Sequence, residues 1–135
     1  MNRAFAAELY VNAIAVAQEA ARRYAELAER AAQQDNFTAA TLFRSLAQED
    51  ARRLAALQRE SAGLELPLLE ADHSWPAEGF GAAGDALEIA LRAENAARAF
   101  FEQAARTADD PAARTLALEM AAEECAHAAL IAGLK

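Results

Sequence analysis

The chain has 135 residues, a formal net charge of −8 and 41 alanines, but only two valines and three isoleucines. Because alanine favours helices and β-branched residues favour strands, this composition predicts a single all-α domain and argues against a sheet. The acidic balance argues against a nucleic-acid partner, and the single cysteine excludes an internal disulfide.

Four helices are expected, over residues 3–33, 36–61, 85–107 and 111–134, with a long segment at 62–84 between the second and the third. The start signals are Asp35, Asp85 and the pair Asp110-Pro111. The short links within each half predict two antiparallel hairpins. The segment 62–84 is long enough to run back along a helix of about 38 Å. The predicted fold is therefore a ferritin-like four-helix bundle with a long crossover, forming one domain over 1–135.

The sequence gives no reason to expect a membrane partner. Residues 5–17 are fairly apolar, but Glu8 and Asn12 interrupt this run, which argues against a signal peptide. No apolar run approaches the roughly 20 residues that cross a bilayer. We therefore expect a cytoplasmic protein, and a homodimer because bundles of this size commonly pair.

Polar residues interrupt the apolar seams at mid-helix. Helix 111–134 carries an apolar stripe with spacings of four and three, in which Glu124 and His127 form a central Glu-x-x-His. Glu94 holds the same central place in helix 85–107. A buried carboxylate must be protonated, ion-paired or bound to metal. Since oxygen and imidazole ligands suit iron, manganese or zinc, these three residues predict a metal centre.

These residues resemble the rubrerythrin-type branch of the ferritin-like superfamily, over nearly the whole chain. In that family each half supplies a Glu seven residues before a Tyr or Phe, and Glu-x-x-His on its second helix. The second half matches fully, with Glu94, Phe101, Glu124 and His127. The resemblance implies a di-iron carboxylate bundle that reduces peroxides or oxidises and stores iron.

The first half departs from that pattern at all three ligand positions. Ala17, seven residues before Tyr24, stands in place of the first Glu, and Asp50 and Arg53 stand in place of Glu-x-x-His. Asp50 is a weaker ligand because its side chain is one methylene shorter. With Asp50 added to the three residues of the second half, the remaining ligands suit one iron better than two.

Arg53 suggests how the lost ligands are compensated. Arginine is permanently charged and suits carboxylate pairing. We hypothesise that its guanidinium donates to Asp50, Glu94 or Glu124, which would replace part of the positive charge of a metal. Tyr24 is expected in the core, with a hydrogen bond to the polar centre as the alternative.

Ordinary surface roles stay open at this stage. Glu94 could pair with Arg98 at i,i+4, and Asp50 with Arg53 at i,i+3, both on solvated faces. Cys125 is expected to be a buried or half-buried small residue rather than a catalytic thiol.

Two functions from different classes follow. The first is a ferritin-like metal-dependent oxidoreductase that acts on peroxide or dioxygen, or that handles iron. Full rubrerythrins also carry a CxxC-rich iron–sulfur module, so a chain with one cysteine would need an external electron donor. The second is a non-catalytic bundle in which a salt-bridged polar core replaces the di-iron site and which acts as a binding or structural module. Neither function calls for an organic cofactor.

Overall fold

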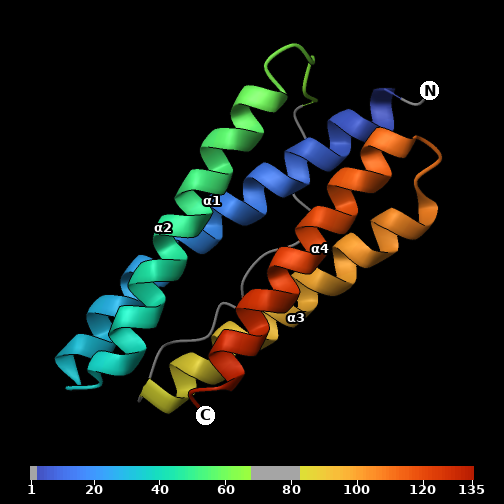
Figure 1. Ribbon diagram of the computed structural model, residues 1–135. Coiled ribbons are helices and arrows are strands. Elements are labelled where there is room, and N and C mark those ends of the chain that lie inside the picture. The colour runs from blue at the N-terminus through green and yellow to red at the C-terminus, as the bar shows by residue number, and fades with distance from the viewer. Residues whose placement is uncertain (1–2, 68–82) are drawn as a thin grey trace.

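The computed structural model describes residues 3–67 and 83–135, which form four helices (Figure 1). These are α1 (Arg3–Gln33), α2 (Phe37–Glu60), α3 (Ala83–Thr107) and α4 (Pro111–Ala132). The described residues contain no strand, so the predicted all-α, ferritin-like four-helix bundle is confirmed. None of the described helices combines the length and the apolarity that a membrane span needs.

The helices form two antiparallel hairpins, α1 with α2 and α3 with α4 (Figure 1). The turn at 34–36 joins the first pair and the turn at 108–110 joins the second. The first residues of α1 and the last turns of α3 lie close enough to line one cavity. The predicted crossover at 62–84 lies mostly outside the described residues. Its described start includes Leu64 and Leu66, which are half-buried.

The helix starts show where local signals succeed and where they are ambiguous. Asn36 caps α2 by accepting a hydrogen bond from the Ala39 backbone N–H at 3.1 Å. Asp35 instead turns the chain, with a left-handed φ of 59°. The predicted Asp35 cap was wrong by one residue, because Asp and Asn are equally good caps. Pro111 opens α4 after Asp110, as predicted, but the Asp110 side chain makes no capping hydrogen bond.

The start of α3 also differs from the prediction. This helix begins at Ala83, two residues before Asp85. Asp85 therefore lies in the first turn and does not precede it.

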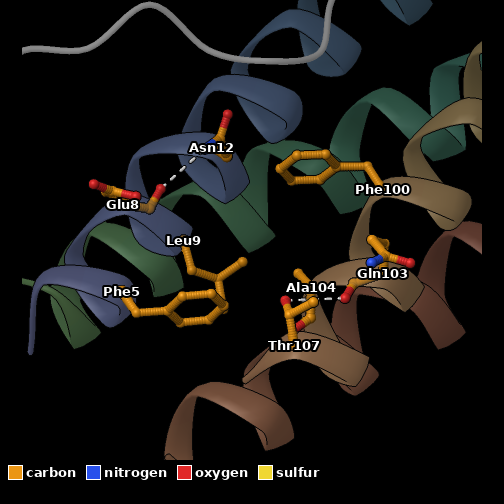
Figure 2. Close-up of a pocket in the computed structure, with 8 residues that line it drawn as sticks. All are labelled: Phe5, Glu8, Leu9, Asn12, Phe100, Gln103, Ala104 and Thr107. Carbon is orange, nitrogen blue, oxygen red and sulfur yellow. Dashed lines mark hydrogen bonds between the residues drawn. The ribbon is translucent and has the colours of Figure 1, made fainter. Parts of the chain in front are cut away.

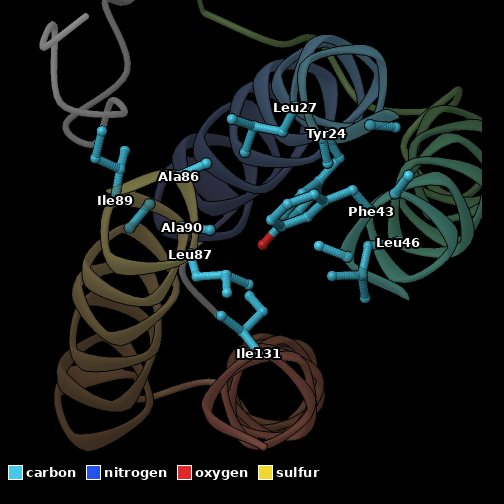
Figure 3. Close-up of a cluster of buried hydrophobic side chains, with 14 of the residues drawn as sticks. Tyr24, Leu27, Phe43, Leu46, Ala86, Leu87, Ile89, Ala90 and Ile131 are labelled. Atoms are coloured by element: carbon cyan, nitrogen blue, oxygen red, sulfur yellow. The ribbon is translucent and has the colours of Figure 1, made fainter. Parts of the chain in front are cut away.

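Two apolar clusters fill the bundle, one on each side of a buried polar layer. In the first, the rings of Tyr24 and Phe43 stack with their centroids 5.8 Å apart, and Figure 3 shows the Tyr24 hydroxyl pointing to the middle of the bundle. The largest members of the second cluster are Leu9, Val16, Leu57, Phe101, Leu116 and Met120. Alanine makes up much of both clusters, which lets the helices approach closely.

The polar layer lies where each seam changes from one cluster to the other. Along α2, Asp50 comes between Leu46 of the first cluster and Leu57 of the second. Glu94 takes the same place on α3, between Ala93 of the first cluster and Ala97 of the second. The predicted seams therefore turn polar at one level of the bundle.

Replacing Phe43 by alanine tests the core, because this ring is fully buried. Phe43→Ala is expected to lower the free energy of unfolding by about 3–5 kcal/mol through lost burial and the resulting cavity. Phe37→Ala on the same helix is the matched control, since Phe37 is 63% exposed, and a change within about 0.5 kcal/mol is expected. Equal losses in urea denaturation would contradict the described packing.

Candidate metal centre

Asp50, Glu94 and His127 meet at the polar layer, each from a different helix. One carboxylate oxygen from each acid and one ring nitrogen of His127 all lie within 4.8 Å of one another. The three residues are only 2–3% exposed. Each sits in the middle of the seam of its own helix, so the apolar residues before and after it hold the backbone in place. The structure thus brings together three of the four residues predicted as ligands, and Glu124 lies outside this group.

Each of these three residues has a buried polar atom without a hydrogen-bond partner. These atoms are Asp50 Oδ2, Glu94 Oε2 and His127 Nδ1. Burying such an atom unsatisfied costs about 1–3 kcal/mol. Three unsatisfied atoms in one group of two carboxylates and an imidazole match what a bound divalent cation would satisfy.

Glu94 is the carboxylate that keeps its charge. Burial acts to raise the pKa of Glu94, but the hydrogen bonds with Glu124 and Tyr24 and the adjacent His127 outweigh burial and lower it. The pKa of Glu124 is raised, first by burial and then by its hydrogen bond with Glu94. Glu124 therefore carries the proton that the two carboxyl groups share.

Tyr24 supports the same carboxylate from α1. Its hydroxyl donates a hydrogen bond to Glu94 Oε1. Burial raises the pKa of Tyr24, and the nearby Glu94 raises it further, so the phenol stays protonated. The core position and the alternative hydrogen bond considered for Tyr24 are therefore both present.

Asp50 and His127 complete the charge balance. Burial raises the pKa of Asp50 to about 8, although the positive charge of His127 works against this shift. Burial acts to lower the pKa of His127, but Glu94 and Asp50 outweigh it and raise that pKa to about 9. In the metal-free centre these shifts therefore favour the protonated forms of Asp50, Glu124 and His127 and the anionic form of Glu94.

Arg53 does not make the contact that its position predicted. It forms an ion pair with Glu123 of α4, instead of donating to Asp50, Glu94 or Glu124. The periodicity places Arg53 in the seam of α2, but its side chain is 26% exposed and lies at the edge of that seam, so the predicted partner was wrong. From there its long side chain reaches across to α4. The positive charge next to Glu94 comes from His127, whose Nδ1 lies 3.7 Å from Glu94 Oε1.

Two contacts were not predicted from the sequence. Each involves a glutamate that directly precedes a carboxylate of the polar layer. Glu49 Oε2 lies 3.0 Å from His127 Nε2, and Glu123 pairs with Arg53. Both contacts join α2 to α4. The signal that could have found them is the internal repeat, because Glu49 and Glu123 are 74 residues apart, as are Arg53 and His127.

The surface alternatives fare differently. Glu94 and Asp50 are buried, so neither lies on a solvated face. Arg98 donates to the Cys125 sulfur at 3.8 Å instead of pairing with Glu94. Cys125 is exposed, and the prediction that it would be buried or half-buried was wrong. Ala17 is buried in the second apolar cluster, where it offers a methyl group and no ligand atom.

A separate cavity of about 220 Å³ lies between the start of α1 and the end of α3 (Figure 2). Phe5, Leu9 and Phe100 give it apolar walls, and Asn12 adds a polar group whose amide donates to the Glu8 carbonyl. The residues that line it, drawn in Figure 2, do not include Asp50, Glu94 or His127. The cavity therefore belongs to the end of the bundle and not to the polar layer.

Removing the Tyr24 hydroxyl tests the support of Glu94. Tyr24→Phe is expected to lower the free energy of unfolding of the metal-free protein by about 1.5–3 kcal/mol at pH 7, since a hydrogen bond to a charged group is lost. Tyr10→Phe is the matched control, because the Tyr10 hydroxyl makes only a 3.5 Å contact to Glu60. Similar losses for both variants would show that Glu94 gains nothing from Tyr24.

The free energy of unfolding of the metal-free protein should fall as the pH rises from about 4 to about 9. Asp50 and His127 both bind protons more tightly in the folded state, so the contribution of Asp50 is lost between pH 3.8 and about 8 and that of His127 between pH 6.5 and about 9. Chemical denaturation in a chelator at several pH values measures this trend. Asp50→Asn should flatten it, because the amide stays neutral, whereas an unchanged slope would contradict the raised pKa of Asp50.

The comparisons with known proteins agree with this architecture. No family model matches the chain, and neither does any curated protein. Among solved structures, the chain is similar to the crystal structure of COG1633, an uncharacterized conserved protein from Magnetospirillum magnetotacticum. The two are 30% identical and superpose with a TM-score of 0.85, over 95% of this chain and 91% of that one. The chain therefore belongs to the COG1633 family of conserved proteins.

Proposed function

We propose that this protein is a ferritin-like metal protein of the rubrerythrin type and that it binds one divalent ion. The resemblance of its sequence to rubrerythrins suggests that this ion is iron. The ion would be held by Asp50, Glu94 and His127. The observation that supports this most directly is the set of three buried, unsatisfied atoms on these residues. An arrangement of one imidazole and two carboxylates fits iron, manganese or zinc.

The first half of the chain limits the centre to one ion. Ala17 contributes a buried methyl group where a second ion would need a carboxylate. Arg53 brings a permanent positive charge, already paired with Glu123, where a second ion would need an imidazole. A second divalent cation would thus lack two ligands and face a neighbouring guanidinium.

The residues around the ion would prepare it for redox chemistry. Bound iron would supply the one-electron chemistry through which ferritin-like proteins act on peroxide or dioxygen, with electrons from an external donor. Tyr24 holds Glu94 in place, and Glu124 keeps a proton beside Glu94 that it could give to a peroxide oxygen as the O–O bond breaks and electrons from the external donor reduce that oxygen to water. The two apolar clusters keep bulk water away from both ends of the centre.

Metal loading tests the proposal. The purified protein is expected to bind one equivalent of iron(II) per chain under anaerobic conditions, measured by elemental analysis after desalting. The isosteric variants Asp50→Asn and Glu94→Gln, and the variant His127→Gln, should each bind iron at least about 10- to 100-fold more weakly, since even a change outside the ligand shell costs that much affinity. Glu102→Gln, on the exposed face of α3, is the matched control and should bind like wild type. Two tightly bound ions per chain would sink the one-ion assignment.

A variant of Glu124 tests whether this residue is a metal ligand or a proton carrier. Because Glu124 lies outside the group of three, Glu124→Gln should reduce iron affinity less than Glu94→Gln does. The amide of the variant can still donate a hydrogen bond to Glu94 but cannot supply a mobile proton. Loss of binding as complete as that in Glu94→Gln would make Glu124 a direct ligand.

A non-catalytic bundle is the second candidate, and one specific observation favours it. In the metal-free centre His127 already lies 3.7 Å from Glu94, and burial favours the protonated forms of Asp50 and Glu124. A protein that binds no iron, manganese or zinc, and that unfolds cooperatively without them, would support this reading over the first.

A further inference from the structure

The imidazole of His127 has two different neighbourhoods. Nδ1 lies 3.7 Å from Glu94 Oε1 and has no hydrogen-bond partner, whereas Nε2 lies 3.0 Å from Glu49 Oε2. Glu49 belongs to α2, and its side chain is 42% exposed. It stands in a groove of about 570 Å³ between α2 and α4, and His127 also lines this groove. The ring thus separates a solvent-facing carboxylate from the buried centre.

The internal repeat places a second contact of the same kind beside the first. Glu123 on α4 reaches Arg53 on α2, just as Glu49 on α2 reaches His127 on α4. In each pair, the acid directly precedes a carboxylate of the polar layer, and the base belongs to the opposite half. Arginine has no lone pair to offer a metal, so only the pair with His127 can orient a ligand.

We propose that Glu49 is a positioning residue that fixes His127 with its Nδ1 lone pair directed at the metal between Asp50 and Glu94. This inference rests on the proposed metal-binding function and adds a residue outside the ligand group. The Glu49 carboxylate accepts a hydrogen bond from the Nε2–H of His127. The proton therefore stays on Nε2, and Nδ1 is left as the ligand atom. The same hydrogen bond makes the imidazole a stronger donor to the ion.

The contact also holds the ring against rotation. A flip about the Cβ–Cγ bond would turn the ring away from both the unsatisfied carboxylate oxygens and Glu49. Because the Glu49 backbone is fixed beside Asp50 on α2, one helix positions both a ligand and the orienting group of a second ligand. Asp50 and His127 therefore keep a fixed position relative to each other even though His127 comes from α4.

Zinc affinity and an NMR signal together test this role. Zinc alone is the probe, and its affinity is measured by chelator competition. Glu49→Ala should weaken zinc binding about 10- to 100-fold. Glu49→Gln should lose less, because its amide oxygen still accepts the hydrogen bond. Glu26→Ala on α1 is the matched control, since Glu26 is similarly exposed at 45% and ion-paired, but with Arg22 and Arg23 away from the centre.

The NMR readout follows the Nε2–H proton of His127 in the zinc-loaded protein. A downfield, slowly exchanging signal is expected in the wild type and in Glu49→Gln, and its loss is expected in Glu49→Ala. A signal retained in Glu49→Ala, or equal zinc affinities for Glu49→Ala and wild type, would overturn the positioning role while leaving the proposed function intact. Failure of the wild type itself to bind zinc, iron or manganese would instead remove the proposed function, and this inference with it.

Discussion

The structure depends on one constraint, which is that several ionisable groups are buried at the same level of a small bundle. Two apolar clusters above and below shield these groups from solvent at both ends of the layer, so each buried charge needs a partner inside the protein. The four helices share this task. α1 supplies the Tyr24 hydroxyl, α2 and α3 supply Asp50 and Glu94, and α4 supplies an acid and an imidazole. The packing of the four helices therefore depends on the contacts among the polar groups at the centre, and those contacts depend on the packing.

The lost symmetry of the repeat explains the character of this centre. A site with matching halves would place equal ligands around two ions. Here one half keeps the Glu-x-x-His pattern, and the other has replaced it with Asp50 and Arg53. The replacement is conservative for packing, because Arg53 still joins α2 to α4 through Glu123. It changes the chemistry, since a guanidinium binds no cation. The bundle thus has a cross-link between α2 and α4 from each half, whereas two of its three candidate ligand residues, Glu94 and His127, lie in the second half.

Much of this could be predicted from the sequence, and the misses have a common physical origin. The period of the apolar residues identified the seams and hence the buried positions of Glu94 and His127. Periodicity gives the face on which a residue lies, but not where a long side chain at the edge of that face ends. Arg53 and Glu49 are both such edge residues, so their partners depend on which helix lies opposite. Glu49, nearly half exposed, also looks like an ordinary surface glutamate until His127 is placed beside it.

The polar layer has a further consequence for an alanine-rich bundle. Seams made largely of small side chains offer few features that distinguish one alignment of two helices from another displaced along the axis. If α4 were displaced by two turns along its axis, His127 would lie against the methyl groups of an apolar cluster. Glu94 would then lack the positive charge that pairs with it. The cost of such uncompensated buried charges is several kcal/mol. The residues that would hold an ion thus also set the axial register of the helices. A single buried polar residue sets the register of a coiled coil in the same way.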